Sequence, residues 1–161
     1  MSAPPYRICF VCLGNICRSP MASVVTQRLV ADAGLDVQVD SAGTGSWHVG
    51  GAANPPAAAA LQRQGYDAGG HSARQFGAAD FADYDLVIGL DRQNVADLRR
   101  LAPSPDEAAK VRLLRDFDPA AGLGDRDVAD PYGGTDAEFD HALQLVVAAC
   151  RGLLETLPVR R

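Results

Sequence analysis

Short, almost continuously apolar runs recur along this chain. The first, Arg7 to Leu13, has the composition expected of a strand that is buried on both faces of a sheet. Three similar runs follow, at Val37 to Val39, Leu86 to Leu90 and Val111 to Leu114. The pattern therefore predicts about four strands, each lying within a covered sheet.

Segments with helical periodicity lie between these runs, at Pro20 to Ala33, Pro56 to Gln64 and Gln93 to Leu101. An alternation of strands and helices is typical of βαβ units, whose strands are parallel. We therefore expect an α/β fold. In this fold a doubly wound sheet of about four parallel strands, in the flavodoxin-like order 2-1-3-4, is flanked by helices on both faces.

The last helix has the clearest pattern. Its apolar residues recur at steps of three and four, at Phe139, Leu143, Val146, Val147, Cys150, Leu153, Leu154 and Leu157. Thr135, with Glu138 three residues later, predicts a capping box at the start of this helix. Cys150 belongs to the apolar stripe, so we interpret it as a packing residue and not as a catalytic thiol.

The length and net charge of the chain limit the number of domains and the kinds of partner that it can have. With 161 residues, of which 47% are hydrophobic, the chain predicts a single domain over residues 1–161, with loose ends at 1–5 and 159–161. A net charge of -5 argues against partners that need a basic surface, namely nucleic acid and anionic membranes. No apolar run approaches the roughly 20 residues that span a bilayer, and no export signal precedes the first strand. We expect a cytoplasmic monomer or weak dimer.

Four cysteines occur, and a chain of this size does not need a disulfide framework, so we expect free thiols in a reducing compartment. Cys9 and Cys12 have the C-x-x-C spacing of a thioredoxin-like motif or of half a zinc site. No second pair of ligands follows at a matching spacing. We therefore expect no metal site.

The segment from Cys12 to Ser19 lies between a predicted strand and a predicted helix. A loop in this position can turn successive backbone N–H groups inward around an oxyanion, and the helix N-terminus adds donors and a positive dipole. The planar fork of Arg18 can hold two phosphoryl oxygens at once. The predicted phosphate-binding loop consists of Leu13, Gly14, Asn15, Ile16, Cys17, Arg18 and Ser19.

Cys12 is the candidate nucleophile of this loop. The donors that bind an oxyanion also stabilise negative charge on sulfur, so we expect a thiolate that attacks the phosphoryl group and forms a phosphocysteine intermediate. Ser19 has two possible roles, which the sequence leaves open. It can cap the helix, with Pro20 at the first helical position, or donate its hydroxyl to the Cys12 sulfur.

Asp130 is the candidate general acid, because the leaving oxygen of a phosphate ester departs more easily when it is protonated. It lies in the segment from Asp116 to Thr135, whose Asp, Gly and Pro content predicts a long surface loop. Pro131 restricts Asp130 to extended backbone conformations. Several other aspartates share this loop, so spacing by itself does not single out Asp130.

The run C-L-G-N-I-C-R-S-P-M-A resembles the signature of the low-molecular-weight protein tyrosine phosphatases. The resemblance continues in S-A-G-T-G-S-W-H-V-G from Ser41, in G-L-D-R-Q-N from Gly89 and in D-P-Y from Asp130. It implies a fold of the expected kind and an enzyme without a cofactor, acting on phosphotyrosine in proteins and binding phosphate and similar oxyanions.

The resemblance also implies residue roles. Cys12 would be the nucleophile, Arg18 the phosphate clamp and transition-state stabiliser, and Asp130 the general acid. Asn15 would hold the loop in shape through hydrogen bonds to Ser41 and His71, with Ser19 supporting the thiolate. A phenyl-sized slot would be formed by Ile16, Trp47 and Tyr132.

Three further positions bear on this comparison. Cys17 resembles the second cysteine of the family, which can form a reversible disulfide with the nucleophile; it could also be a small core residue. Gly133 stands where many members carry a second aromatic residue, so one slot wall is expected to be thinner. His48 has no ligand partners nearby and is interpreted as structural or exposed.

Alternative functions differ from this prediction in identifiable residues. Arginine phosphatases of the same fold tend to carry threonine at the position of Ile16. Thiol-dependent arsenate reductases lack the D-P acid and carry extra cysteines, of which the segment from Gly70 to Leu101 has none. A non-catalytic phosphotyrosine-binding module would need Arg18 but neither Cys12 nor Asp130.

Overall fold

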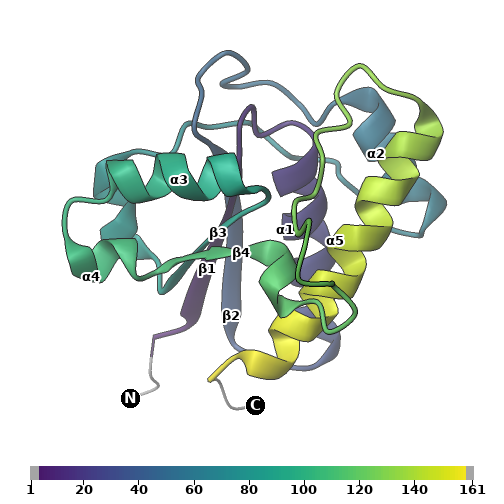
Figure 1. The fold of residues 1–161 in the computed structure, drawn as a ribbon. Helices are drawn as coiled ribbons and strands as arrows, with labels where there is room; N and C mark the ends of the chain where they lie inside the picture. The colour runs from purple at the N-terminus through teal and green to yellow at the C-terminus, as the bar shows by residue number, and fades with distance from the viewer. Residues whose placement is uncertain (1–3, 159–161) are drawn as a thin grey trace.

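The computed structural model describes residues 4–158, which form a parallel sheet covered by helices on both faces (Figure 1). The strands are β1 (Tyr6–Cys12), β2 (Val37–Gly43), β3 (Leu86–Gly89) and β4 (Val111–Leu113). They pair in the order β2-β1-β3-β4, and every pair is parallel. The predicted fold class and strand order are therefore confirmed. Residues 1–3 and 159–161, which belong to the predicted loose ends, lie outside the described residues.

The helices fall close to the predicted segments. They are α1 (Arg18–Asp32), α2 (Pro55–Arg63), α3 (Arg92–Leu101), α4 (Pro105–Ala108) and α5 (Asp136–Thr156), with two 3-10 helices, η1 (Ala78–Asp83) and η2 (Leu114–Phe117). At the start of α5 the Thr135 hydroxyl accepts the Glu138 N–H at 3.3 Å, and Glu138 accepts the Thr135 N–H at 3.4 Å. The predicted capping box is confirmed.

Alternate residues of β1 point into two separate cores. Ile8 and Phe10 pack with α1, α2 and α5, whereas Cys9 and Val11 pack with α3 and η1 on the other face. The same alternation places the thiols of Cys9 and Cys12 on opposite faces of the sheet. They cannot work together as a redox pair or as half a metal site. Cys150 is fully buried on α5, as predicted.

The arrangement of the strands determines where a site can form. Because all four strands are parallel, their carboxyl ends lie at one edge of the sheet, and the loops that follow them gather there. Those loops begin at Cys12, Gly43, Gly89 and Leu113. No helix among residues 4–158 is long and apolar enough to cross a bilayer.

Candidate active site

The loop from Cys12 to Ser19 runs from the last residue of β1 into the first turn of α1. Its central residue, Asn15, has φ of 57°, the one left-handed non-glycine residue within the described range 4–158. Its side chain compensates through three hydrogen bonds of 2.9 Å, donated to the Ser19 and Ser41 hydroxyls and accepted from the Arg74 N–H. The loop is thus held by a bond within itself and by residues from two other parts of the chain.

His71 contacts the backbone of the same residue. Its Nε2 lies 2.6 Å from the Asn15 carbonyl oxygen, and because a carbonyl can only accept, Nε2 carries the proton. Ser41 and His71 therefore make the contacts with Asn15 that the family resemblance implies. Asn15 is completely buried, so losing any of these partners would leave an unpaired polar group.

Ser19 does not cap α1. The helix begins at Arg18, so Cys17 occupies the N-cap position, and its side chain makes no capping hydrogen bond. The Ser19 oxygen instead lies 2.9 Å from the Cys12 sulfur and 3.3 Å from the Ala42 carbonyl oxygen. A hydroxyl has one proton, so Ser19 can donate either to a Cys12 thiolate or to Ala42. The capping role is wrong, and donation to sulfur is the alternative that the geometry leaves.

Arg18 is almost entirely buried, and one edge of its guanidinium group is already occupied. Its Nη1 donates to Asp91 at 2.5 Å and to the Val128 carbonyl at 3.0 Å, which uses both of its hydrogens. The Nε and Nη2 edge has no hydrogen bond within residues 4–158, and Nη2 lies 3.8 Å from the Asp130 carboxylate. This edge can bind two phosphoryl oxygens.

The charges around Arg18 keep it protonated. Burial alone would lower its pKa, but the negative charges of Cys12, Asp91 and Asp130 outweigh burial and raise the pKa above the ordinary arginine value. Asp91 was missed from the sequence as a site residue, although it follows β3 at the carboxyl edge of the sheet. That position was the available signal.

Asp130 reaches the site from the long loop before α5. The loop is anchored by the completely buried Val128, whose N–H donates to the Leu90 carbonyl at 2.9 Å. Two residues later, Asp130 accepts the Tyr132 N–H at 3.1 Å, with Pro131 buried between them. The acid is therefore partly exposed but tied to a fixed point of the core.

These residues enclose a pocket of about 190 Å³, lined by Cys12, Leu13, Gly14, Ile16, Cys17, Arg18, Trp47, His48, Asp130 and Tyr132. Trp47 and Tyr132 are 73% and 58% exposed, so both have apolar area free to cover a ligand. The sequence-predicted slot residues Ile16, Trp47 and Tyr132 thus lie around one pocket together with the loop and Asp130.

His48, interpreted from the sequence as structural or exposed, also lines this pocket. Its ring lies 6.2 Å from that of Tyr132, at a tilt of 48°. A Cβ atom at Gly14 would lie only 3.1 Å from the His48 ring, so the absence of a side chain at Gly14 permits this approach. His48 therefore supplies ring surface to the pocket beside Tyr132. Gly133, which is left-handed with φ of 80°, is not among the residues that line the pocket.

Cys17 lines the pocket beside the nucleophile and is a free cysteine. Burial, followed by the negative charges of Asp130 and Cys12, raises the pKa of its thiol to about 12. Cys17 is therefore protonated at neutral pH. A nucleophilic cysteine must be a thiolate, so Cys17 is not suited to that role.

This chain is similar to a set of known proteins. Residues 7–160 match the family described as low molecular weight phosphotyrosine protein phosphatase. A low molecular weight protein-tyrosine-phosphatase of Streptomyces coelicolor is 54% identical over 92% of both chains, and protein-tyrosine phosphatase A of Mycobacterium bovis is 44% identical over 92% of this chain and 90% of its own. The crystal structure of YfkJ from Bacillus subtilis, 35% identical, covers 97% of this chain and 96% of its own with a TM-score of 0.87.

Proposed function

Since this chain belongs to the low-molecular-weight phosphotyrosine protein phosphatase family, we propose that Cys12, Arg18 and Asp130 hydrolyse phosphotyrosine in protein substrates through a phosphocysteine intermediate. One observation carries the proposal. The Cys12 sulfur, the unoccupied edge of Arg18 and the Asp130 carboxyl group face the same pocket of about 190 Å³. A nucleophile, an oxyanion clamp and an acid are the groups that this reaction needs.

In the first step, the backbone N–H groups of the loop and the Nε and Nη2 edge of Arg18 bind the phosphoryl oxygens. The Cys12 thiolate attacks phosphorus while the bond to the tyrosine oxygen breaks. Asp130, in its protonated form, donates its proton to that oxygen, so tyrosine leaves as a neutral phenol. The phosphoryl group remains on Cys12.

In the second step, the Asp130 carboxylate accepts a proton from water as the water oxygen attacks phosphorus. The bond from phosphorus to sulfur breaks, and inorganic phosphate is released with Cys12 as a thiolate. The Ser19 hydroxyl, 2.9 Å from sulfur, stabilises this leaving thiolate by turning its proton from Ala42 toward Cys12. Asn15 donates to the Ser19 oxygen at 2.9 Å and holds it in place.

Selectivity for an aromatic phosphate ester follows from the pocket walls. Trp47 and Tyr132 offer ring faces, and Ile16 gives an apolar surface inside the loop. A phenyl ring between these walls brings its phosphate to the loop floor. A phosphoserine side chain is shorter and would leave the walls uncovered.

Cys17 is proposed to protect the nucleophile from overoxidation. Peroxide oxidises the Cys12 thiolate to a sulfenic acid and releases hydroxide; the Cys17 sulfur then attacks that sulfur, forming a disulfide and water. The negative charge on Cys12, which contributes to the raised pKa of Cys17, disappears on oxidation, so Cys17 becomes easier to ionise. Reductant should restore activity after peroxide in the parent protein but not in Cys17→Ser.

The four cysteines are all free, which supports location in a reducing compartment, and we infer the cytoplasm. Substrates there would be phosphotyrosine-containing proteins, bound by a monomer or weak dimer.

The decisive experiment compares hydrolysis of an activated aryl phosphate with that of phosphotyrosine, phosphoserine and phosphoarginine peptides. Cys12→Ser is expected to lose all turnover and still bind phosphate. Asp130→Ala should lose about 10²- to 10⁴-fold on phosphotyrosine and much less on an aryl phosphate whose leaving group needs no proton.

Retained activity of Cys12→Ser would exclude a cysteine nucleophile. An equal loss on both leaving groups would exclude Asp130 as the acid. A clear preference for phosphoarginine over phosphotyrosine would assign the chain to the alternative substrate class.

A further inference from the structure

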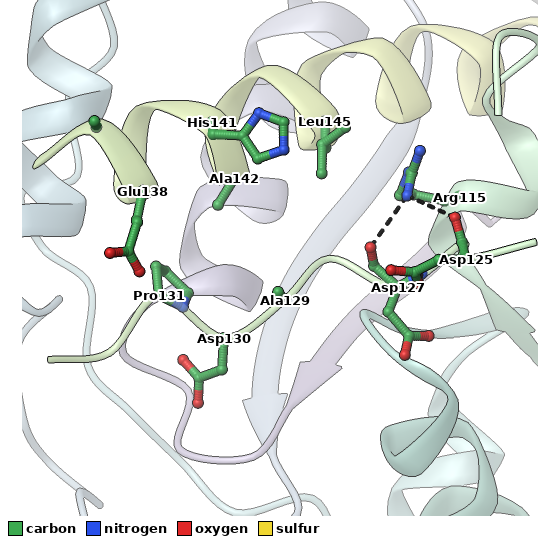
Figure 2. Close-up of a pocket in the computed structure, with 11 residues that line it drawn as sticks. Arg115, Asp125, Asp127, Ala129, Asp130, Pro131, Glu138, His141, Ala142 and Leu145 are labelled. Atoms are coloured by element: carbon green, nitrogen blue, oxygen red, sulfur yellow. Dashed lines mark hydrogen bonds between the residues drawn. The ribbon is translucent and has the colours of Figure 1, made fainter. Parts of the chain in front are cut away.

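A second cavity, of about 530 Å³, lies behind the segment that carries Asp130. Figure 2 shows His141 and Leu145 of α5 on one side, the backbone around Ala129 on the other, and Arg115 at one end. The volume lies within the roughly 300–1,000 Å³ typical of sites for small molecules. It shares Asp130, and no other lining residue, with the pocket that contains Cys12.

Arg115 lines this cavity and has one edge without a hydrogen bond in the described part of the chain. Its Nη1 donates to the carbonyl oxygens of Asp125 and Asp127, at 3.1 and 3.2 Å, which uses both hydrogens of that nitrogen. Its Nε is buried, and within residues 4–158 it has no hydrogen-bond partner. No carboxylate of the described residues lies within 4.0 Å of this guanidinium group to neutralise it. The Nε and Nη2 edge is the one with which arginine binds a carboxylate by two parallel hydrogen bonds.

The acidic residues that line the cavity are engaged elsewhere. Asp127 accepts the Arg92 N–H at 2.9 Å, and Asp130 lies 3.8 Å from Arg18. Glu138 accepts the Thr135 N–H in the capping box at the positive end of α5. Asp125 accepts the Asp127 N–H at 2.8 Å and is exposed at the loop surface. Arg115 is thus the cation of this cavity that no carboxylate of residues 4–158 contacts within 4.0 Å, while Asp127 and Asp130 each lie within 4.0 Å of another arginine.

The rest of the lining is apolar or weakly polar. Ala129 and Pro131 contribute from the loop, and Ala142 and Leu145 from α5, while His141 makes no hydrogen bond within the described part of the chain. We propose that this cavity binds a small organic carboxylate with an apolar body. The carboxylate pairs with the Nε and Nη2 edge of Arg115, and the body covers Pro131, Ala142 and Leu145.

A ligand bound in this cavity would affect the segment that carries Asp130. Arg115 already holds the carbonyls of Asp125 and Asp127, and Pro131 follows Asp130 directly. A ligand between Arg115 and Pro131 would therefore contact the loop on both sides of Val128, which anchors it to the core.

The test uses 3-phenylpropionate as the probe and its neutral amide as the matched compound, with the catalytic loop saturated by inorganic phosphate. Amide proton and nitrogen shifts of the labelled protein report where each compound binds. The acid should shift residues 125–131 and 137–145, and the amide should bind at least tenfold more weakly.

Three variants locate the interaction. Arg115→Gln should weaken 3-phenylpropionate binding at least tenfold, whereas Arg126→Gln should not change it, because Arg126 is paired with Asp116 at 3.0 Å and does not line the cavity. Ala137→Leu should weaken binding by filling the cavity from an exposed position of α5, with the Arg115 contacts left intact.

Arg115→Gln could weaken binding simply by disturbing the loop that Arg115 holds. Ala137→Leu fills the cavity without removing those contacts, so weaker binding in that variant shows that the cavity itself is the site. The proposal is overturned if the neutral amide binds as well as the acid, or if Arg115→Gln binds like the parent. It is also overturned if the only shifts lie in residues 12–19.

Discussion

Asp91 serves two elements with its two oxygens. One accepts the Asn94 N–H at 2.7 Å and caps α3, and the other accepts Arg18 Nη1 at 2.5 Å. Because Nη1 is held there, the guanidinium plane cannot rotate, and its other edge stays available for a phosphoryl group. We therefore regard Asp91 as a positioning residue that sets the orientation of Arg18.

Asp91→Asn tests this separately from helix capping, since asparagine caps a helix as well as aspartate does. The variant keeps the cap but loses the charge opposite Arg18. We expect kcat on phosphotyrosine to fall about tenfold, because even small misplacement of a clamping group is costly. Tm should also fall, because the buried Arg18 loses its carboxylate partner. Asp97→Asn on the same helix should leave kcat unchanged. A normal kcat for Asp91→Asn would show that the loop alone orients Arg18.

The four thiols differ in their surroundings. Burial raises the pKa of Cys9, Cys17 and Cys150 to about 12 in each case. Thiols with so high a pKa are protonated at pH 7 and react poorly with alkylating agents. Cys12 faces the pocket and has the Ser19 hydroxyl 2.9 Å away.

Iodoacetamide at pH 7 is therefore expected to modify Cys12 first and almost exclusively. Peptide mass spectrometry after timed exposure measures this, and inorganic phosphate in the loop should slow the modification. Comparable rates at Cys12 and Cys17 would contradict the assignment of Cys12 as the reactive thiol.

At the scale of elements, the phosphate loop depends on one left-handed residue. Asn15→Gly removes the three side-chain hydrogen bonds but accepts φ of 57°, whereas Asn15→Ala removes the same bonds and also strains the backbone. We expect the glycine variant to lose about 2 kcal/mol of unfolding free energy or more. The alanine variant should lose about 1 kcal/mol beyond that.

Urea denaturation of both variants, with turnover measured on the same samples, provides the check. Both variants should have low activity, because Ser19 loses the donor that holds its hydroxyl. Equal stabilities of Asn15→Gly and Asn15→Ala would show that the left-handed backbone is not a significant cost at this position.

The long elements could be predicted from the sequence because each buries a periodic apolar face. α4, η1 and η2 were not predicted, since four to six residues are too few to show a helical period. β2 was predicted to end at Val39 but extends to Gly43. Asp40 and Ser41 interrupt the apolar run because they bond Tyr84 and Asn15 beside the site.

The residues of the site also differ in how far their positions could be predicted from the sequence. Cys12 and Arg18 lie on one short loop, so their proximity follows from the local sequence. Asp91 lies 73 residues from Arg18, and only the pairing of β1 with β3 brings them together. His48 meets Tyr132 across two loops that have no periodic pattern of their own. Such contacts depend on tertiary structure, and the sequence alone gave no spacing from which to infer them.

At the scale of the whole molecule, the sheet separates two cores, and each contains a fully buried thiol. Cys9 lies in the core beside α3, and Cys150 lies in the core beside α5. Burial raises the pKa of both from 9.0 to about 12, and burial also raises the pKa of Tyr84. Unfolding exposes these groups to water, where they ionise at lower pH.

The sign of the pH dependence of stability follows from the difference in pKa between the folded and the unfolded state. Between about pH 9 and 12 the unfolded chain has lost protons that the folded protein still binds, so the free energy of unfolding falls as pH rises. Below pH 9 both states hold these protons, and the groups make no contribution to the slope. Each buried thiol adds up to about 1.4 kcal/mol per pH unit.

Cys150→Ala should therefore reduce the steepness of this decline by about 1.4 kcal/mol per pH unit between pH 10 and 11.5, whatever its effect on stability at pH 8. Val146→Ala, a truncation in the same core without a titratable group, should lower stability at every pH and keep the parent slope. Urea unfolding at several pH values measures both slopes. If Cys150→Ala and Val146→Ala gave the same slope, the Cys150 thiol would not be a source of the alkaline instability, and the titration would have to arise from the other groups whose pKa burial raises, among them Cys9, Cys17 and Tyr84.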